Sequence, residues 1–280
     1  INLDKAWVGL RPWDEALDLT VGRHGNPFVK TTELVWDEDL TFDGSYLKLR
    51  FGDMNNNLSL VGAYSLFQIA GLDPAKPRAG RNSFNTDTDT SGMMSGGVSA
   101  SFGGPDSVMF MVGGNYHQYT NVNNLIGKTL SLNPRTNLLT ADGKAHISQF
   151  RLATGSLMLS LFPGAYLPLT VHADVSYNLG AGANAGAADA ANADLRKRAQ
   201  AENLGIVAGA MLGKLEEAGN IVLGFNYKMV GTDSVFSAFN EDMLGGTNIT
   251  AFEGKLGFQL APKTSLVLKG QIATKINDPD

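Results

Sequence analysis

The clearest pattern in the chain is an alternation of apolar and polar residues from Leu167 to Leu179. One set of positions holds Leu167, Leu169, Val171, Ala173, Val175, Tyr177 and Leu179, and the other holds Thr170, His172, Asp174, Ser176 and Asn178. A period of two is typical of a β-strand with one apolar and one polar face. The run exceeds the usual soluble strand of about 5 to 6 residues. It suits a strand tilted across a bilayer, which needs about 9 to 11 residues.

The same alternation returns at 251–260 and 265–272, with Glu253, Lys255 and Lys269 on the polar side. A soluble β-sandwich also alternates, but its strands are shorter and its polar face is the outward one. A membrane barrel has the opposite arrangement, with apolar residues toward lipid and polar residues toward water. Long strands with charges on one face therefore favour the barrel, and a soluble sandwich is the less favoured reading.

Twelve strands are expected along the chain. They lie near 3–11, 17–22, 47–51, 58–66, 94–102, 108–116, 147–162, 167–179, 204–212, 221–229, 251–260 and 265–272. The facing of the first strand is ambiguous, because Trp7 and the alternate set Ala6, Val8 and Leu10 are both apolar and could face lipid. A break of phase at 154–156 predicts a β-bulge. A short helix is expected within 187–200, because Ala and Arg favour helices.

The connections between these strands alternate in length. Those at 12–15, 53–57, 103–106, 163–166, 215–220 and 261–264 are short, and most of the others are long. Outer-membrane barrels have short periplasmic turns on one rim and long extracellular loops on the other. The sequence therefore predicts an all-β, antiparallel transmembrane β-barrel that forms a single domain over 1–280. Trp13, Tyr119, Phe162 and Tyr166, near strand ends, are expected in interfacial aromatic girdles.

Composition agrees with a single barrel. A chain of 280 residues would ordinarily suggest two soluble domains, yet no linker or change of composition divides it. The absence of Cys excludes thiolate zinc sites, disulfides and c-type haem attachment. No apolar run reaches the roughly 18 residues of a transmembrane helix, and Ile1 to Asp4 does not begin a signal peptide.

Several short stretches resemble one family. They are Ile1-Asn2-Leu3-Asp4-Lys5-Ala6-Trp7, Arg11-Pro12-Trp13-Asp14, Val21-Gly22-Arg23, Asn26-Pro27-Phe28, Leu34-Val35-Trp36-Asp37-Glu38-Asp39-Leu40 and Gly245-Gly246-Thr247-Asn248. The chain resembles the "putative porin" family of Gram-negative outer membranes. The resemblance implies a sixteen-stranded barrel in the bacterial outer membrane, with about three strands before these twelve and one after. It also implies a homotrimer and no cofactor.

The solute preference of a porin depends on the residues that line its water-filled pore. By phase, the pore-lining candidates are Asp18, Lys48, Arg50, Arg151, His172, Asp174, Lys228, Glu253, Lys255 and Lys269. Bases outnumber acids there, whereas many acids fall in connections: Asp37, Glu38, Asp39, Asp43, Asp87, Asp89, Glu241 and Asp242. Because Lys and Arg attract anions at close quarters, a weak anion preference is expected. Charge pairing across the lumen wall is the alternative.

One long connection is expected to fold inward and narrow the pore. The favoured segment is Gly71–Gly92, whose charged residues are Lys76, Arg78, Arg81, Asp87 and Asp89. The segment Asn121–His146 is the second candidate. An exposed loop on the rim is the alternative for either.

The sequence gives little support for calcium binding, for another metal site or for esterase activity. Asp87–Gly92 resembles the start of a calcium loop, but Val98 occupies the position of the closing acid. His24, His117, His146 and His172 lack ligand spacing, so no metal site is expected. No G-x-S-x-G motif suggests an esterase.

Two functions remain. The first is an outer-membrane porin, a non-enzymatic channel for passive diffusion of small hydrophilic solutes or ions. The second is a structural barrel that sheathes or holds a partner protein. The expected partners are outer-membrane lipid, lipopolysaccharide beside the basic run 196–198, and the solutes themselves, with no nucleic acid.

Overall fold

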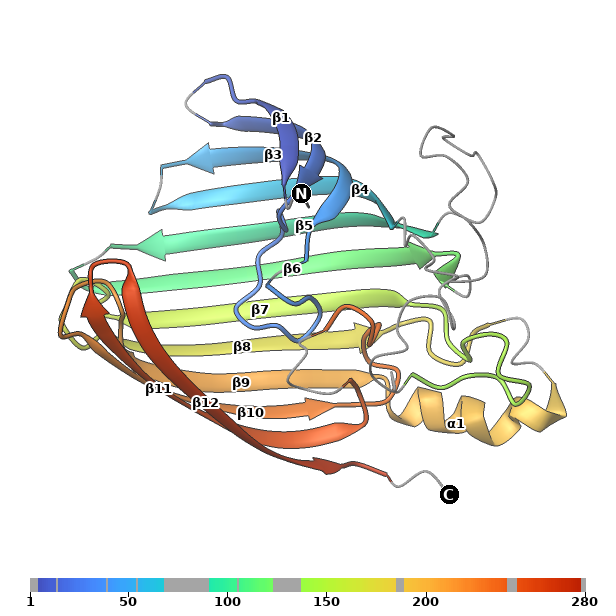
Figure 1. Ribbon diagram of the computed structural model, residues 1–280. Helices are drawn as coiled ribbons and strands as arrows, with labels where there is room; N and C mark the ends of the chain where they lie inside the picture. The colour runs from blue at the N-terminus through green and yellow to red at the C-terminus, as the bar shows by residue number, and fades with distance from the viewer. Residues whose placement is uncertain are drawn as a thin grey trace, which may run out of the picture.

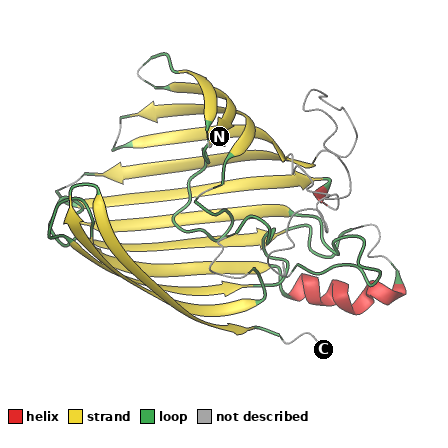
Figure 2. Cartoon of the chain, in the orientation of Figure 1, coloured by secondary structure: helices red, strands yellow, loops and turns green. Residues whose placement is uncertain are grey.

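The computed structural model describes residues 5–13, 15–38, 40–53, 55–67, 91–104, 106–122, 137–184, 189–240 and 246–277. These residues form one sheet of twelve antiparallel strands, each hydrogen-bonded to its neighbours in chain order (Figures 1 and 2). The strands are β1 (Ala6–Leu10), β2 (Leu17–His24), β3 (Phe42–Gly52), β4 (Asn57–Phe67), β5 (Ser91–Gly103), β6 (Val108–Thr120), β7 (Arg151–Leu161), β8 (Leu169–Asn178), β9 (Leu204–Gly213), β10 (Ile221–Val230), β11 (Ile249–Ala261) and β12 (Thr264–Lys275). Among the described residues the sheet curves like a barrel wall but does not close, because β1 pairs only with β2 and β12 only with β11.

The two faces of the sheet differ in polarity as the alternation predicts. On β8, Val171 and Tyr177 are 47% and 44% exposed, whereas Asp174 and Ser176 are buried. We call the face of Val171 the outer face and the face of Asp174 the inner face. An exposed apolar outer face and a buried polar inner face are the reverse of a soluble sandwich. The expected all-β, barrel-like fold is confirmed.

The facing of β1 follows from its pairing with β2. Val8 lies opposite Val21, and Leu10 opposite Leu19, and all four are exposed on the outer face. Trp7 has the opposite phase and lies on the inner face, where the Arg11 guanidinium is 5.0 Å from the centre of its ring.

The predicted bulge at 154–156 is wrong. Strand β7 pairs with β6 and β8 without a shift of register. The alternation in the sequence is interrupted because Leu152 is apolar yet faces inward, where it is fully buried in an aromatic cluster. A register irregularity occurs instead on β11, between Gln259 and Ala261.

The connections divide into two rims, as expected. Short turns join β1 to β2, β3 to β4, β5 to β6, β7 to β8, β9 to β10 and β11 to β12 at one end of the sheet. Long connections lie at the other end. One of them holds the expected loop helix, as a turn of 3₁₀-helix, η3 (Ala190–Asn192), followed by α1 (Ala193–Ala201). In the described part of the chain, neither helix has the length and apolar character needed to cross a membrane.

An aromatic cluster occupies the inner face near the long connections. Its buried members are Phe28, Trp36, Phe42, Met93, Tyr119, Val122, Phe150, Leu152, Phe236 and Phe239. Tyr119 is therefore not a girdle residue. It shares the inward phase of His117, and its hydroxyl accepts a hydrogen bond of 2.9 Å from Trp36 Nε1. Trp13, Phe162 and Tyr166 are exposed, next to the short turns.

Candidate channel interior

The connection between β2 and β3, residues 25–41, lies across the inner face of the sheet (Figure 1). Asp174 on β8 holds it there. The Asp174 carboxylate accepts hydrogen bonds from the backbone N–H groups of Thr31 and Thr32 and from their hydroxyls, at 3.0 Å and 2.7 Å. We call residues 25–41 the inner segment. Charge-assisted hydrogen bonds of this kind are stronger than neutral ones, so Asp174 is a strong anchor for the middle of the inner segment.

Further contacts hold the inner segment to β6 and β7. The carbonyl oxygen of Val29 accepts hydrogen bonds from Asn115 Nδ2 at 3.2 Å and from Ser156 Oγ at 3.3 Å. Gly113 on β6 leaves room for this approach, because a Cβ atom there would lie 3.1 Å from the Val29 side chain. The Asp37 N–H donates to the carbonyl oxygen of Phe239 at 2.8 Å, which joins the inner segment to the long connections as well.

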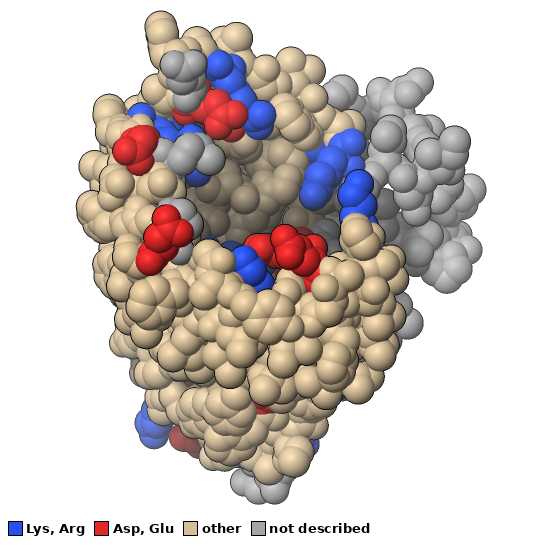
Figure 3. Space-filling model, turned by 90° about the vertical axis from the view of Figure 1, so that its left-hand side faces the viewer, with Lys and Arg blue, Asp and Glu red and all other residues tan. Residues whose placement is uncertain are grey.

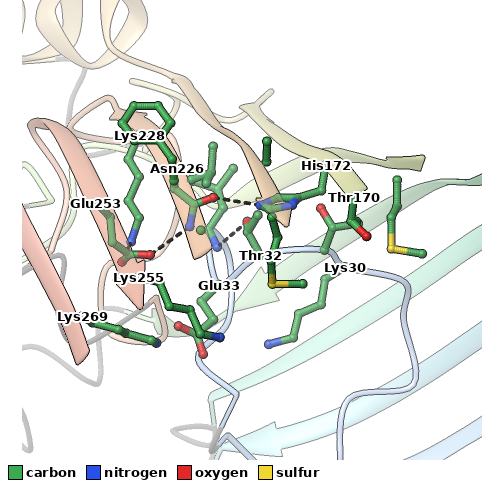
Figure 4. A pocket seen from close by; sticks show the side chains of 18 of the residues that line it. Lys30, Thr32, Glu33, Thr170, His172, Asn226, Lys228, Glu253, Lys255 and Lys269 are labelled. Carbon is green, nitrogen blue, oxygen red and sulfur yellow. Dashed lines mark hydrogen bonds and ion pairs between the residues drawn. The ribbon is translucent and has the colours of Figure 1, made fainter. Parts of the chain in front are cut away.

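A cavity of about 420 Å³ lies between the inner segment and β7–β12 (Figure 4). A chain of polar contacts crosses one of its walls. His172 Nε2 lies 2.8 Å from Asn226 Oδ1, Asn226 Nδ2 donates to Glu253 Oε1 at 2.9 Å, and Lys228 Nζ lies 2.7 Å from Glu253 Oε2. Lys228 and Glu253 are both buried, so their charges neutralise one another at this wall.

Three further lysines line the cavity. Lys255 and Lys269 lie directly opposite each other on β11 and β12. Lys30 comes from the inner segment, and its Nζ donates to the carbonyl oxygen of Trp36 at 2.8 Å. Burial lowers the pKa of Lys30, although nearby acids, Glu33 first among them, oppose the effect. Glu33 and Glu38 also line the cavity.

The cavity brings together about half of the pore-lining candidates. His172, Lys228, Glu253, Lys255 and Lys269 border it, and Asp174 holds the segment that forms its opposite side. The others lie elsewhere. Arg151 begins β7, near the long connections, where its backbone N–H donates to Asn178 Oδ1.

Asp18, Lys48 and Arg50 form a separate group on β2 and β3. Asp18 lies 3.1 Å from Arg11 Nε and opposite Lys48 in the register. Arg50 lies 3.5 Å from Glu15. Charge pairing, the alternative expected for the lumen wall, thus occurs on these strands and at Lys228–Glu253.

Some charged residues expected in loops lie in other places or outside the described residues. The constriction candidates Lys76, Arg78, Arg81, Asp87 and Asp89 lie outside the described residues. Among the acids assigned to connections, Asp43 instead lies within β3 and pairs with Arg23 at 2.7 Å, and Glu38 lines the cavity.

Sequence reasoning missed the inner segment. Its residues Lys30, Thr31, Thr32, Glu33 and Leu34 line the cavity, but they have no periodic pattern of their own. The available signal was glycine at inward phases of the strands, such as Gly113 beside Val29 and Gly205 beside Leu34. A side chain is absent there because another part of the chain occupies the space.

The short-turn end of the sheet is hollowed, with acidic and basic side chains around the hollow (Figure 3). In the described part of the chain, no three His, Asp or Glu residues gather in a way that could hold a metal ion.

Comparison with known proteins agrees with the barrel-like architecture. A search of curated proteins found no match. A family model described as "Putative porin" matches residues 1–158, more than half of the chain. Membership of this family implies a membrane location. The chain, with its apolar outer face, polar inner face and inward-folded segment, belongs to the "Putative porin" family.

Proposed function

We propose that the protein forms a water-filled channel for passive diffusion of small hydrophilic solutes or ions, with a weak preference for anions. The observation that carries the proposal is the cavity between the inner segment and β7–β12, on the polar face of a sheet whose other face is apolar. Four lysines and three glutamates line it. Because Lys228 and Glu253 neutralise each other, three lysines face two glutamates in the remaining volume.

The test is the conductance of the protein refolded from detergent into planar bilayers, with a salt gradient across the membrane. We expect discrete steps of current and a reversal potential displaced toward that of chloride. A reversal potential displaced toward the cation would contradict the anion preference. A folded, inserted protein without any current steps would contradict the channel.

One observation favours a second function, a structural barrel that sheathes or holds a partner protein. The aromatic cluster packs ten buried side chains inside the sheet, near the long connections. A core of this kind obstructs part of the lumen, as in a plugged barrel. Absence of current together with co-purification of a partner protein would favour this function.

The proposed setting is the outer membrane of a Gram-negative bacterium, with a homotrimer as the assembly. The outer face would contact lipid, and the basic residues of α1, Arg196 and Lys197, would meet lipopolysaccharide. We also propose that the membrane form is a single sixteen-stranded barrel domain, in which about three strands join the β1 side and one joins β12. Unpaired backbone groups are costly in a bilayer, which supports closure.

A further inference from the structure

We propose that the cavity binds a small organic carboxylate with an apolar body. Its carboxylate would face Lys255 and Lys269, and its apolar part would lie against Met158 and Met211. The inference rests on the channel function proposed above and adds the class of solute that the channel prefers.

The basic side of the cavity is a pair of like charges held close together. Lys255 and Lys269 are directly opposite in the β11–β12 register, and like charges at such positions repel. In the part of the chain that the structure describes, neither forms an ion pair. Gly224 is the β10 partner of Lys255, and a Cβ atom there would lie 3.3 Å from Lys255 Cβ, so glycine leaves space beside the lysine. A bound anion would relieve the repulsion.

The surrounding charges cancel this pair only in part: the lining holds four lysines and three glutamates, and Lys269 acts electrostatically on Glu253. Lys228 and Glu253 neutralise each other at 2.7 Å. Glu33 and Glu38 come from the inner segment, which also contributes Lys30. The lining as a whole has one lysine more than it has glutamates. Lys255 and Lys269 lie together on the β11–β12 wall, with Glu33 near them in the view of Figure 4.

The β7–β9 side of the cavity carries two methionines, with Thr170 and His172 of β8 between them. Met158 on β7 and Met211 on β9 are half-buried lining residues, with Leu34 and Val207 buried beside them. The flexible, polarisable thioether of methionine adapts to apolar ligands of different shape. A volume of about 420 Å³ falls within the usual range of small-molecule sites. A basic wall opposite a pair of methionines fits a solute that has one anionic and one apolar end.

The experiment measures how solutes interrupt the chloride current of the whole protein in planar bilayers. The probes are benzoate, its neutral analogue benzamide, the cation benzylamine, and acetate, which has the charge without the apolar body. We expect benzoate to half-block the current at a concentration about tenfold below that of each other probe. Equal block by benzoate and benzamide would overturn the role of the lysines, and stronger block by benzylamine would reverse the proposed polarity.

Two double variants test the contribution of each wall of the cavity to the block. Lys255→Gln with Lys269→Gln should weaken block by benzoate about tenfold, from the loss of two charge interactions. Met158→Gln with Met211→Gln should weaken the block by benzoate about fivefold and leave the block by acetate unchanged. The matched control is Lys275→Gln, which removes a charge from the far end of β12 and should leave the block unchanged. Unaltered block in the double lysine variant would overturn the inference.

Failure of the inference is distinguishable from failure of the channel. Current without selective block by benzoate contradicts the inference and leaves the channel intact. If the folded protein carries no current, equilibrium dialysis of benzoate against detergent-folded protein decides the inference. Saturable binding that the double lysine variant loses would support the site, and no saturable binding would overturn it.

Discussion

The Asp174 carboxylate accepts hydrogen bonds from backbone and hydroxyl groups of both Thr31 and Thr32, and it is only 5% exposed. The two threonines present four donors to one side chain. Removing a buried acceptor leaves its donors without partners, which costs more than the hydrogen bonds contribute on balance. The position of the inner segment, and with it the shape of the cavity, therefore depends strongly on this one residue.

Asp174→Ala should release the inner segment from β8. We expect a larger single-channel conductance, because the segment no longer crosses the lumen at this point. We also expect a loss of unfolding free energy of about 2 to 4 kcal/mol. Single-channel recording and thermal unfolding in detergent measure the two effects.

The control is Asp53→Ala. Asp53 also accepts backbone hydrogen bonds, from Asn55 and Asn56 at 2.8 Å and 2.7 Å, but it lies in the exposed β3–β4 turn. Its loss should leave the conductance unchanged. An Asp174→Ala protein that folds and conducts like the unaltered one would contradict the prediction that this anchor keeps the path narrow.

Among the elements, the long connections are joined to one another by buried polar groups. The carboxylate of Asp233, between β10 and β11, accepts hydrogen bonds from the Ser148 hydroxyl and from the Leu138 N–H at 2.9 Å. Asn178 Nδ2 at the end of β8 donates to the Asp233 carbonyl oxygen at 2.9 Å. Two connections and the end of β8 thus meet at a fully buried residue.

This arrangement should depend on pH. Burial raises the pKa of Asp233 to about 6 from an ordinary value of 3.8, although the hydrogen bonds it accepts oppose the rise. The folded state therefore favours the protonated acid more than the unfolded chain does. This contribution is fully present below about pH 4 and is lost as the pH rises through about 6, a change on the order of 3 kcal/mol.

The measurement is the hydrogen-exchange protection of the Leu138 amide at pH 5 and pH 7, corrected for the intrinsic exchange rate. We expect greater protection at pH 5 in the unaltered protein and no pH difference in Asp233→Asn. The amide of Ala173, in the middle of β8, is the internal reference. Equal protection of Leu138 at both pH values would contradict the proposed coupling.

The strands could be predicted from the sequence and the inner segment could not. Alternation identifies a strand such as β8 from its own residues, because one face of the strand is apolar and the other is polar. Thr31 and Thr32 acquire their role only from Asp174, which lies more than 140 residues away in the chain. Half of their contacts use backbone N–H groups, which every residue but proline possesses. Leu152 and Tyr119 misled the prediction because an apolar cluster inside the sheet interrupts its polar inner face.

On the scale of the whole molecule, the described sheet has two open edges. In an antiparallel edge strand, only alternate residues direct their N–H and C=O groups toward the one neighbour. In β12 the other residues therefore direct theirs away from β11. Each such group without a partner costs several kcal/mol in the hydrocarbon of a bilayer. The proposed closure by additional strands removes this cost.

Closure predicts a uniform pattern of amide protection in β12. In the protein folded in lipid, all amides across 265–274 should exchange slowly, as expected also for β11, which has a partner on each side. An open edge would instead give slow and fast amides at alternate positions, because only those facing β11 are hydrogen-bonded. Hydrogen exchange resolved to single residues distinguishes the two patterns. Strand β10, which has a partner on each side, is the control, and alternation confined to β12 would contradict a closed barrel.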